Sequence, residues 1–253
     1  MREQRLFWTL VISSAAILAV TMGIRQSAGL LVSPLNTTTG LGIVTISLAM
    51  AVGQFVWGAV QPLFGMLADR VGTYKVIVLG AVLLALGMAI APFVRSGLGL
   101  IFAMGVLTAA GAGGGSFSIL IGAAAQRLPA ERRSFAAGFI NAGGSFGQFV
   151  FAPLAQALIQ VFGLITAMIA LGASALSTLF LALPLRERAG VAAERAALQS
   201  EGMTLGRQVR LALRDRSYLC LHAGFFTCGF HIAFLVTHLP GEVGLCGLPA
   251  SVG

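Results

Sequence analysis

The sequence predicts an all-α membrane protein, a bundle of transmembrane helices. Its 253 residues are 57% hydrophobic and only 9% charged, whereas about a quarter of the residues of a soluble domain are charged. The apolar residues gather in long uncharged runs, and the basic residues gather in alternate connections between those runs. We therefore expect the lipid bilayer as a partner and no nucleic acid, although the formal net charge is +8.

Seven apolar runs predict seven spans. Each is long enough to cross a bilayer core of about 30 Å, because a helix rises about 1.5 Å per residue. The runs cover residues 7–35, 43–64, 76–94, 98–125, 135–159, 164–185 and 217–239. The first run is too long for the apolar core of a signal peptide, so we expect an uncleaved first helix.

The basic residues predict the orientation. Fourteen of them fall on the side of the amino terminus, and Arg95 alone falls on the other side. Because basic loops stay in the cytoplasm, we expect a multi-pass protein of a cell (inner) membrane with a cytoplasmic amino terminus. The predominance of arginine over lysine suggests a bacterial source. The fourteen are Arg2, Arg5, Arg70, Lys75, Arg127, Arg132, Arg133, Arg186, Arg188, Arg195, Arg207, Arg210, Arg214 and Arg216.

A short charged turn, residues 65–75, joins the second and third spans. We expect Gly65 to let its helix approach a neighbour closely, and Gly72 to take the positive φ that suits a tight turn. Asp69 can accept hydrogen bonds from backbone donors at a helix start. The basic residues of the turn can meet lipid phosphates or helix C-termini.

This turn resembles the loop between helices 2 and 3 of the major facilitator superfamily. The resemblance rests on Gly65, Asp69, Arg70, Gly72 and Lys75. It implies a helical bundle that works by alternating access, with these five residues in conformational gating. Asp69 would hold the cytoplasmic ends of neighbouring helices together in the outward-facing state. The alternative is that Asp69 only fixes the turn.

The longest polar connection divides the chain. We expect an N-terminal six-helix half at 1–185, a cytoplasmic linker at 186–216, and helix 7 with the start of a C-terminal half at 217–253. Part of the linker, around Leu198 and Met203–Leu213, is compatible with an amphipathic helix on the membrane surface or with a solvated segment. Because facilitators have twelve spans, the resemblance implies that the chain is a fragment of a longer transporter.

Small residues crowd the fourth and fifth spans. Such residues let helix backbones touch in lipid, so we expect close packing there, with unwound backbone beside a cavity as the alternative. Pro153 permits a bend in the fifth span. The small residues are Gly105, Ala109, Gly113, Gly114, Gly115, Gly143 and Gly147.

Two titratable or charged residues lie inside spans, where such groups are costly and mark functional sites. Arg25 can hold a carboxylate in a bidentate pair, or its side chain can extend to the outer interface. His231 can carry a coupling proton or donate to an anion, or it can bond a neighbouring helix. Each follows a glycine by two residues, and each span ends at a proline. The glycine, the charged or titratable residue and the proline of the first span (Gly23, Arg25, Pro34) each lie 206 residues before their counterparts in the seventh (Gly229, His231, Pro240). This constant offset indicates a repeat of six spans.

Asn141 and Gln148 complete the predicted substrate-binding set, together with Arg25 and His231. They lie seven residues apart, hence on one face of the fifth span. There they can line a cavity or hydrogen-bond between helices, the second being the commoner role.

The segment Gly23–Leu30 resembles the first helix of monocarboxylate and oxalate/formate porters, in which a basic residue at the position of Arg25 is implicated in carboxylate binding. The resemblance implies a secondary transporter of a small organic anion such as a monocarboxylate, and leaves proton coupling open. The alternatives are a drug or sugar exporter and a non-transporting membrane fragment with an assembly or regulatory role. We expect no enzyme activity, no cofactor and no metal.

Overall fold

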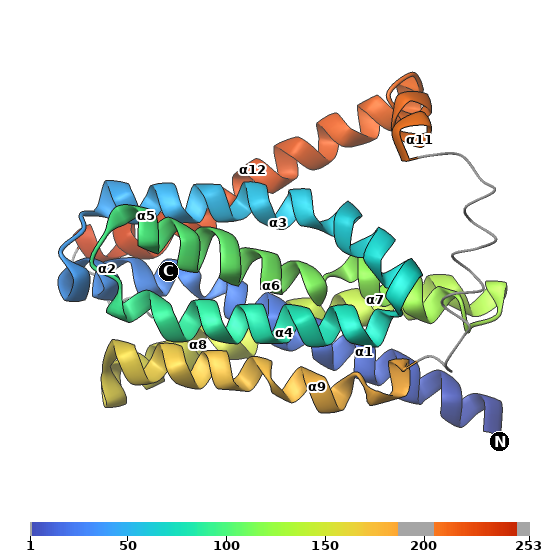
Figure 1. Cartoon of the computed structure of the whole chain (residues 1–253), viewed down its shortest axis with the longest axis horizontal. Coiled ribbons are helices and arrows are strands. Elements are labelled where there is room, and N and C mark those ends of the chain that lie inside the picture. The colour runs from blue at the N-terminus through green and yellow to red at the C-terminus, as the bar shows by residue number, and fades with distance from the viewer. Residues whose placement is uncertain (1, 187–204, 247–253) are drawn as a thin grey trace.

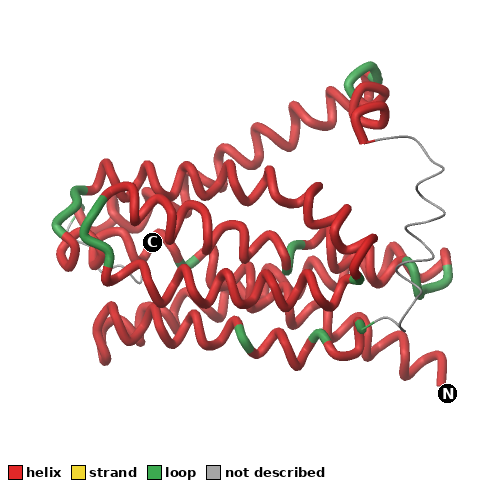
Figure 2. The backbone as a smooth tube through the Cα atoms, viewed as in Figure 1, coloured by secondary structure: helices red, strands yellow, loops and turns green. Residues whose placement is uncertain are grey.

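The structure is a computed structural model, and it describes residues 2–186 and 205–246. Within these residues the chain is helical and contains no strand, so the predicted all-α fold is confirmed. The long helices lie side by side and run back and forth along the long axis of the molecule (Figures 1 and 2). Among the described residues, six helical stretches are long and apolar enough to cross a membrane.

The first membrane-spanning path is interrupted at Ser27, after a helix of 25 residues and before one of 12. It consists of α1 (Arg2–Gln26) and α2 (Ala28–Thr39). At the break, the N–H and the hydroxyl of Ser27 both donate to the carbonyl of Gly23, at 3.1 and 2.8 Å. The buried hydroxyl of Ser27 thus finds its acceptor on the backbone of the same path. The break lies two residues after Arg25, which stands in the last turn of α1.

A glycine turn joins α3 (Ile43–Val71) to α4 (Thr73–Ile90), which continues into the short η1 (Ala91–Phe93). Gly72 has φ 95°, and its N–H donates to the carbonyl of Ala68 at 2.9 Å. The positive φ predicted for Gly72 is therefore confirmed. The close approach predicted at Gly65 is wrong for the described residues, because a Cβ added there meets no atom within 4 Å.

The fourth path changes its winding. It runs through α5 (Gly97–Leu100), a π-helical segment η2 (Ile101–Thr108), α6 (Ala109–Gly114) and α7 (Phe117–Ala125). The widened turn of a π-helix shifts side chains relative to an α-helix, and such turns are frequent at functional sites. A second interruption follows at Gly115 and Ser116, between α6 and α7.

The fifth and sixth paths are joined at one glycine. The helix α8 (Ala130–Ala175) contains Gly163 with φ 77°, where the chain reverses between two spans. The sixth path then continues through α9 (Ser177–Leu181) and η3 (Leu183–Leu185). The predicted boundary between residues 159 and 164 matches this reversal.

After the gap in the described residues come α11 (Leu205–Ala212) and α12 (Arg216–Leu245). The segment around residues 203–213, for which a surface helix and a solvated segment were both open, is helical over Leu205–Ala212, whereas residues around Leu198 lie outside the described residues. The helix α12 packs mainly along α2, and its Arg216 end points away from the bundle (Figure 1). The division of the chain into domains stays a prediction.

Glycines bring the helices into backbone contact. A Cβ added to Gly114 would lie 2.8 Å from the Cα of Gly80, and one added to Gly143 would lie 2.7 Å from the carbonyl oxygen of Ala15. No real side chain fits at such distances. The close packing predicted for the fourth and fifth spans is confirmed, because these contacts are made between backbones of different helices.

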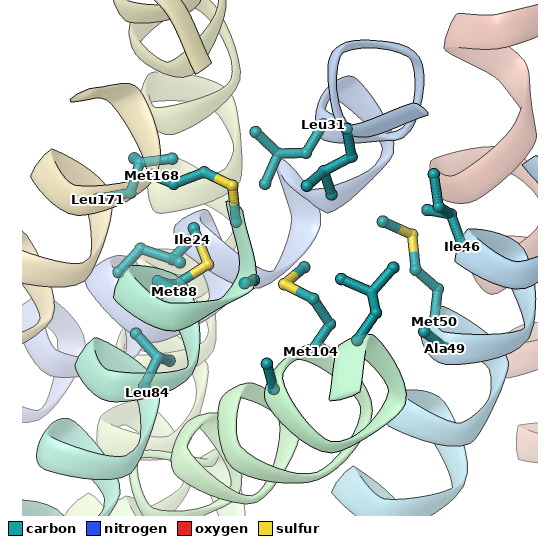
Figure 3. Close-up of a cluster of buried hydrophobic side chains, with 14 of the residues drawn as sticks. Ile24, Leu31, Ile46, Ala49, Met50, Leu84, Met88, Met104, Met168 and Leu171 are labelled. Carbon is teal, nitrogen blue, oxygen red and sulfur yellow. The ribbon is translucent and has the colours of Figure 1, made fainter. Parts of the chain in front are cut away.

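A methionine-rich cluster fills the half of the bundle that contains α2. Met50, Met88, Met104 and Met168 converge there from α3, α4, η2 and α8, around Ile24 and Leu31 of the broken first path (Figure 3). All four methionines are buried. Methionine is flexible enough to fill the irregular space left by a broken helix. This cluster forms one wall of the site described next.

Candidate functional site

Arg25 lies in the last turn of α1 and is half-buried. One guanidinium nitrogen, Nη2, donates to the side-chain oxygen of Gln54 on α3, and Nη1 donates to that of Gln26 at 3.1 Å. The guanidinium also lies over the ring of Trp57, 3.9 Å from its centroid. Among the described residues, the hydrogen-bond partners of this membrane-embedded cation are neutral amides.

A second hydrogen bond extends this group to the fifth span. The side-chain amide of Gln26 donates to the side-chain oxygen of Gln148, 3.4 Å away. Polar side chains from α1, α3 and α8 are thereby linked through a single chain of contacts. Polar groups inside a membrane have to find their hydrogen-bond partners within the protein, since lipid offers none. The chain of contacts therefore holds these three helices in register around Arg25.

A small cavity of about 50 Å³ adjoins the guanidinium. Its wall includes Met50, Gly53, Met104 and Thr108, besides Arg25 and Gln54. The hydroxyl of Thr108 donates to the carbonyl of Ala103 at 2.9 Å, five residues back in the π-helical segment. A cation at the edge of a mostly apolar cavity is suited to bind a small anion, because the low dielectric strengthens the ion pair.

The ring of Trp57 forms a rigid surface against the guanidinium of Arg25. Its Nε1 is buried and has no hydrogen-bond partner among the described residues. Buried indole N–H groups usually find one. Trp57 lies one turn from Gln54 on α3, so both residues face α1. An unpaired donor beside a guanidinium adds to the positive field that an anion would meet.

The structure brings together two of the four predicted substrate-binding residues. Arg25 and Gln148 belong to one polar group, linked by Gln26. Asn141 is exposed on α8. His231 is exposed on α12, and its Nδ1 lies 2.8 Å from the carbonyl oxygen of Thr227 in its own helix. Neither of these two contacts Arg25.

Sequence reasoning missed Gln26, Gln54, Trp57 and Thr108 as members of the site. Neutral polar residues and tryptophans are common in spans, so none stands out as Arg25 does. One signal was available, since Gln54 and Trp57 are three residues apart on one helix and residues at that spacing share a face. Nothing in the sequence indicates that this face meets α1.

The predicted gating residues lie at the carboxyl-terminal end of α3 and the start of α4. Asp69 is half-buried there, whereas Arg70 and Lys75 are exposed. At the same end of the bundle, Arg127 donates to the carbonyls of Pro184 and Leu185, at 2.8 and 2.9 Å. These two carbonyls end the sixth path, and a cation satisfies such terminal acceptors well. This end of the bundle is thus fastened by charged side chains.

Comparison with known proteins agrees with this architecture. Residues 10–253 match the profile of the Major Facilitator Superfamily. Monocarboxylate transporter 13 of Rattus norvegicus is 27% identical over 252 residues, which are 96% of this chain. Monocarboxylate transporter 11 of Mus musculus is 27% identical over 66% of the chain, and the oxalate:formate antiporter of Oxalobacter formigenes is 24% identical over 62%.

The described residues thus form a membrane-spanning bundle of interrupted, glycine-packed helices, with a cation held inside it. The chain belongs to the Major Facilitator Superfamily. It resembles the branch that contains monocarboxylate and oxalate/formate transporters. The matched regions span 56% of the length of the first relative and 37% of each of the other two.

Proposed function

We propose that this protein takes part in the alternating-access transport of a small organic anion of the monocarboxylate class, with Arg25 as the partner of the carboxylate. The observation that carries the proposal is the pairing of Arg25, inside the membrane, with the two neutral amide oxygens of Gln54 and Gln26. Two donors of one guanidinium are thus already directed at two oxygens. A carboxylate presents two oxygens to the same planar fork.

Exchange of the amides for a carboxylate is favourable for an electrostatic reason. Hydrogen bonds between two charged groups are roughly twice as strong as neutral ones. The amides keep the cation satisfied while the site is empty, which lowers the cost of holding it in the membrane. Trp57 fixes the plane of the guanidinium, so little conformational entropy is lost on binding.

The remaining predicted residues enter the proposal in subordinate roles. Gln148 and Asn141 line the path of the anion, and His231 carries a coupling proton or contacts the anion from helix 7. Gly65, Asp69, Arg70, Gly72 and Lys75 take part in gating. The amino terminus is cytoplasmic and the membrane is a bacterial inner membrane. Transport, and no enzymatic conversion of the solute, is the activity.

The test is equilibrium binding of formate, acetate, lactate and oxalate to the purified chain. Trp57 lies against Arg25, so its fluorescence reports binding in a Trp8→Phe background. We expect Arg25→Gln to weaken carboxylate binding about tenfold or more, as expected for a lost charged hydrogen bond. The charge-matched control is Arg95→Gln, because Arg95 bonds the carbonyl of Thr38 at an exposed site.

Carboxylate affinity that is the same in Arg25→Gln and in the parent would overturn the role of Arg25. Quenching by sugars or organic cations, with no response to carboxylates, would instead favour an exporter of the same superfamily. Uptake of a labelled carboxylate into proteoliposomes then separates a transporting protein from a membrane protein that only binds.

A further inference from the structure

An apolar groove of about 530 Å³ runs along the outside of the bundle between α1 and α8. We call it the α1–α8 groove. Its lining is apolar throughout, with Ile12, Ala16 and Ala19 from α1 and Ala142, Gly143 and Phe146 from α8. The groove is open, since Ile12 is 53% and Phe146 65% exposed.

The groove results from the way the two helices pack. Their small residues face each other so closely that a Cβ added to Gly143 would lie 2.7 Å from the carbonyl oxygen of Ala15. Larger residues on the flanks, Ile12 and Phe146, stand out on either side of this seam. The small residues are therefore already used in packing within the molecule, and they leave no room for the close backbone approach of another helix.

The groove faces away from the polar chain of Arg25. Successive residues of a helix are about 100° apart, so residues separated by two point in nearly opposite directions. Phe146 lines the groove, and Gln148, two residues on, bonds Gln26. Phe139 and Asn141 are related in the same way. This side of α8 therefore faces away from the proposed solute path.

Beside the amino-terminal end of the groove lies a second hollow, of about 660 Å³, lined by Arg5, Trp8, Thr9 and Ser13. Ile12 lines both spaces. Arg5 is the one charged residue of this lining among the described residues. Trp8 stands beside it, in edge-on contact with Phe7 at 5.4 Å and with Phe139 at 5.7 Å between ring centroids. Tryptophan with arginine is typical of the membrane–water interface.

The length of the groove fits one leaflet. Ile12 and Val20 line its two ends on α1, and eight residues of helix span about 12 Å. Half of a bilayer core measures about 15 Å. A cationic, wet end at the interface and a dry, narrow channel of this depth match a headgroup and an acyl chain.

We propose that the α1–α8 groove binds an anionic phospholipid, with one acyl chain in the apolar channel and the phosphate-bearing headgroup at Arg5. A zwitterionic lipid lacks the net charge that Arg5 attracts. A second copy of the chain would need to insert a helix about 10 Å wide, and the small residues that permit such contacts are occupied.

The test uses Trp8 as the reporter, in the full chain carrying Trp57→Phe, reconstituted in vesicles of phosphatidylcholine with increasing brominated phosphatidylglycerol. Bromine quenches tryptophan on contact. We expect brominated phosphatidylglycerol to quench Trp8 at a lower mole fraction than brominated phosphatidylcholine does. Arg5→Gln should reduce this preference about fivefold, as expected for one arginine at an anionic surface. Arg214→Gln, at an exposed arginine between α11 and α12, should leave it unchanged.

A second reporter tests the acyl chain. In a Trp8→Phe, Trp57→Phe background, Phe146→Trp should be quenched by lipid brominated in mid-chain, and Ala16→Leu should relieve that quenching by filling the channel. Equal quenching by the two lipids, unaffected by Arg5→Gln, would show only ordinary boundary lipid and overturn the proposal. Shielding of the tryptophan introduced by Phe146→Trp, if it rises with protein concentration, would also overturn it, in favour of a second copy as the occupant.

Discussion

At the scale of single residues, Trp57 is expected to position the guanidinium of Arg25. Its ring supports the guanidinium of Arg25 from below, while Gln54 holds the same cation in plane. A stacked arginine keeps its hydrogen-bonding edge free. Under the proposed function, a carboxylate would take the place of the two amides at that edge without displacing the ring. The aromatic face, rather than the indole N–H alone, is expected to position the cation.

Substitutions at Trp57 test this positioning role. We expect Trp57→Ala to weaken carboxylate binding about 2- to 30-fold, because a cation–π contact contributes about 0.5–2 kcal/mol. Trp57→Phe keeps an aromatic face and should recover most of the affinity. Binding of radiolabelled acetate to the purified chain measures both variants, with Trp8→Phe as the control outside the site. If Trp57→Phe and Trp57→Ala weaken binding equally, the ring does not position Arg25.

At the scale of the elements, contact between backbones sets the stability of the bundle. The contact between Gly80 on α4 and Gly114 on α6 is made between backbones. Neither backbone can move aside without shifting its whole helix. Gly122, farther along the same span, offers a matched contrast, because a Cβ added there meets nothing within 4 Å. The two positions differ in packing and share a helical backbone.

We therefore expect Gly114→Ala to lower the free energy of unfolding by about 1–3 kcal/mol, the usual cost of overpacking. Gly122→Ala should raise it by about 0.5–1 kcal/mol, because alanine loses less backbone entropy in a helix. Unfolding of the purified protein in mixed detergent micelles measures both changes. Equal effects of the two substitutions would contradict the contact described here.

The elements also show what could be predicted from the sequence. The spans follow from apolar runs because lipid permits little else, and Arg25 was evident as a charge within such a run. The turn at Gly72 could be predicted because positive φ favours glycine. The open space around Gly65 and the grouping of Gln54, Trp57 and Gln148 around Arg25 could not be predicted. They depend on how helices rotate about their own axes, which side-chain packing fixes only in the folded molecule.

At the scale of the whole molecule, the end of the bundle near Asp69 is expected to control the balance between conformational states. This end holds the α3–α4 turn, the start of α8 and, fastened through Arg127, the end of the sixth path. A charged contact is worth about 1.5–3 kcal/mol, enough to shift a two-state equilibrium tenfold or more.

Asp69→Asn is therefore expected to shift the ratio of inward- to outward-facing states about tenfold or more, toward the inward-facing state. Spin labels at Val71 and Ser217, in a variant without the exposed Cys220, Cys228 and Cys246, measure that ratio by the distance between the α3–α4 turn and the start of α12. Glu131→Gln, an exposed acid at the same end, is the control. A folded Asp69→Asn protein with an unchanged ratio would assign Asp69 to the turn alone.

The methionine wall beside Arg25 has a consequence for selectivity. Met50, Met88 and Met104 line the cavity, and thioether side chains are polarizable and easily change rotamer. Methionine side chains can adapt to the shape of a bound solute, whereas the guanidinium group binds only a partner of suitable charge and geometry. A binding site of this make-up discriminates strictly by ionic character and loosely by contour. Several short acids of unequal shape should therefore compete for one place, each accommodated by a different arrangement of the same sulfur-containing side chains.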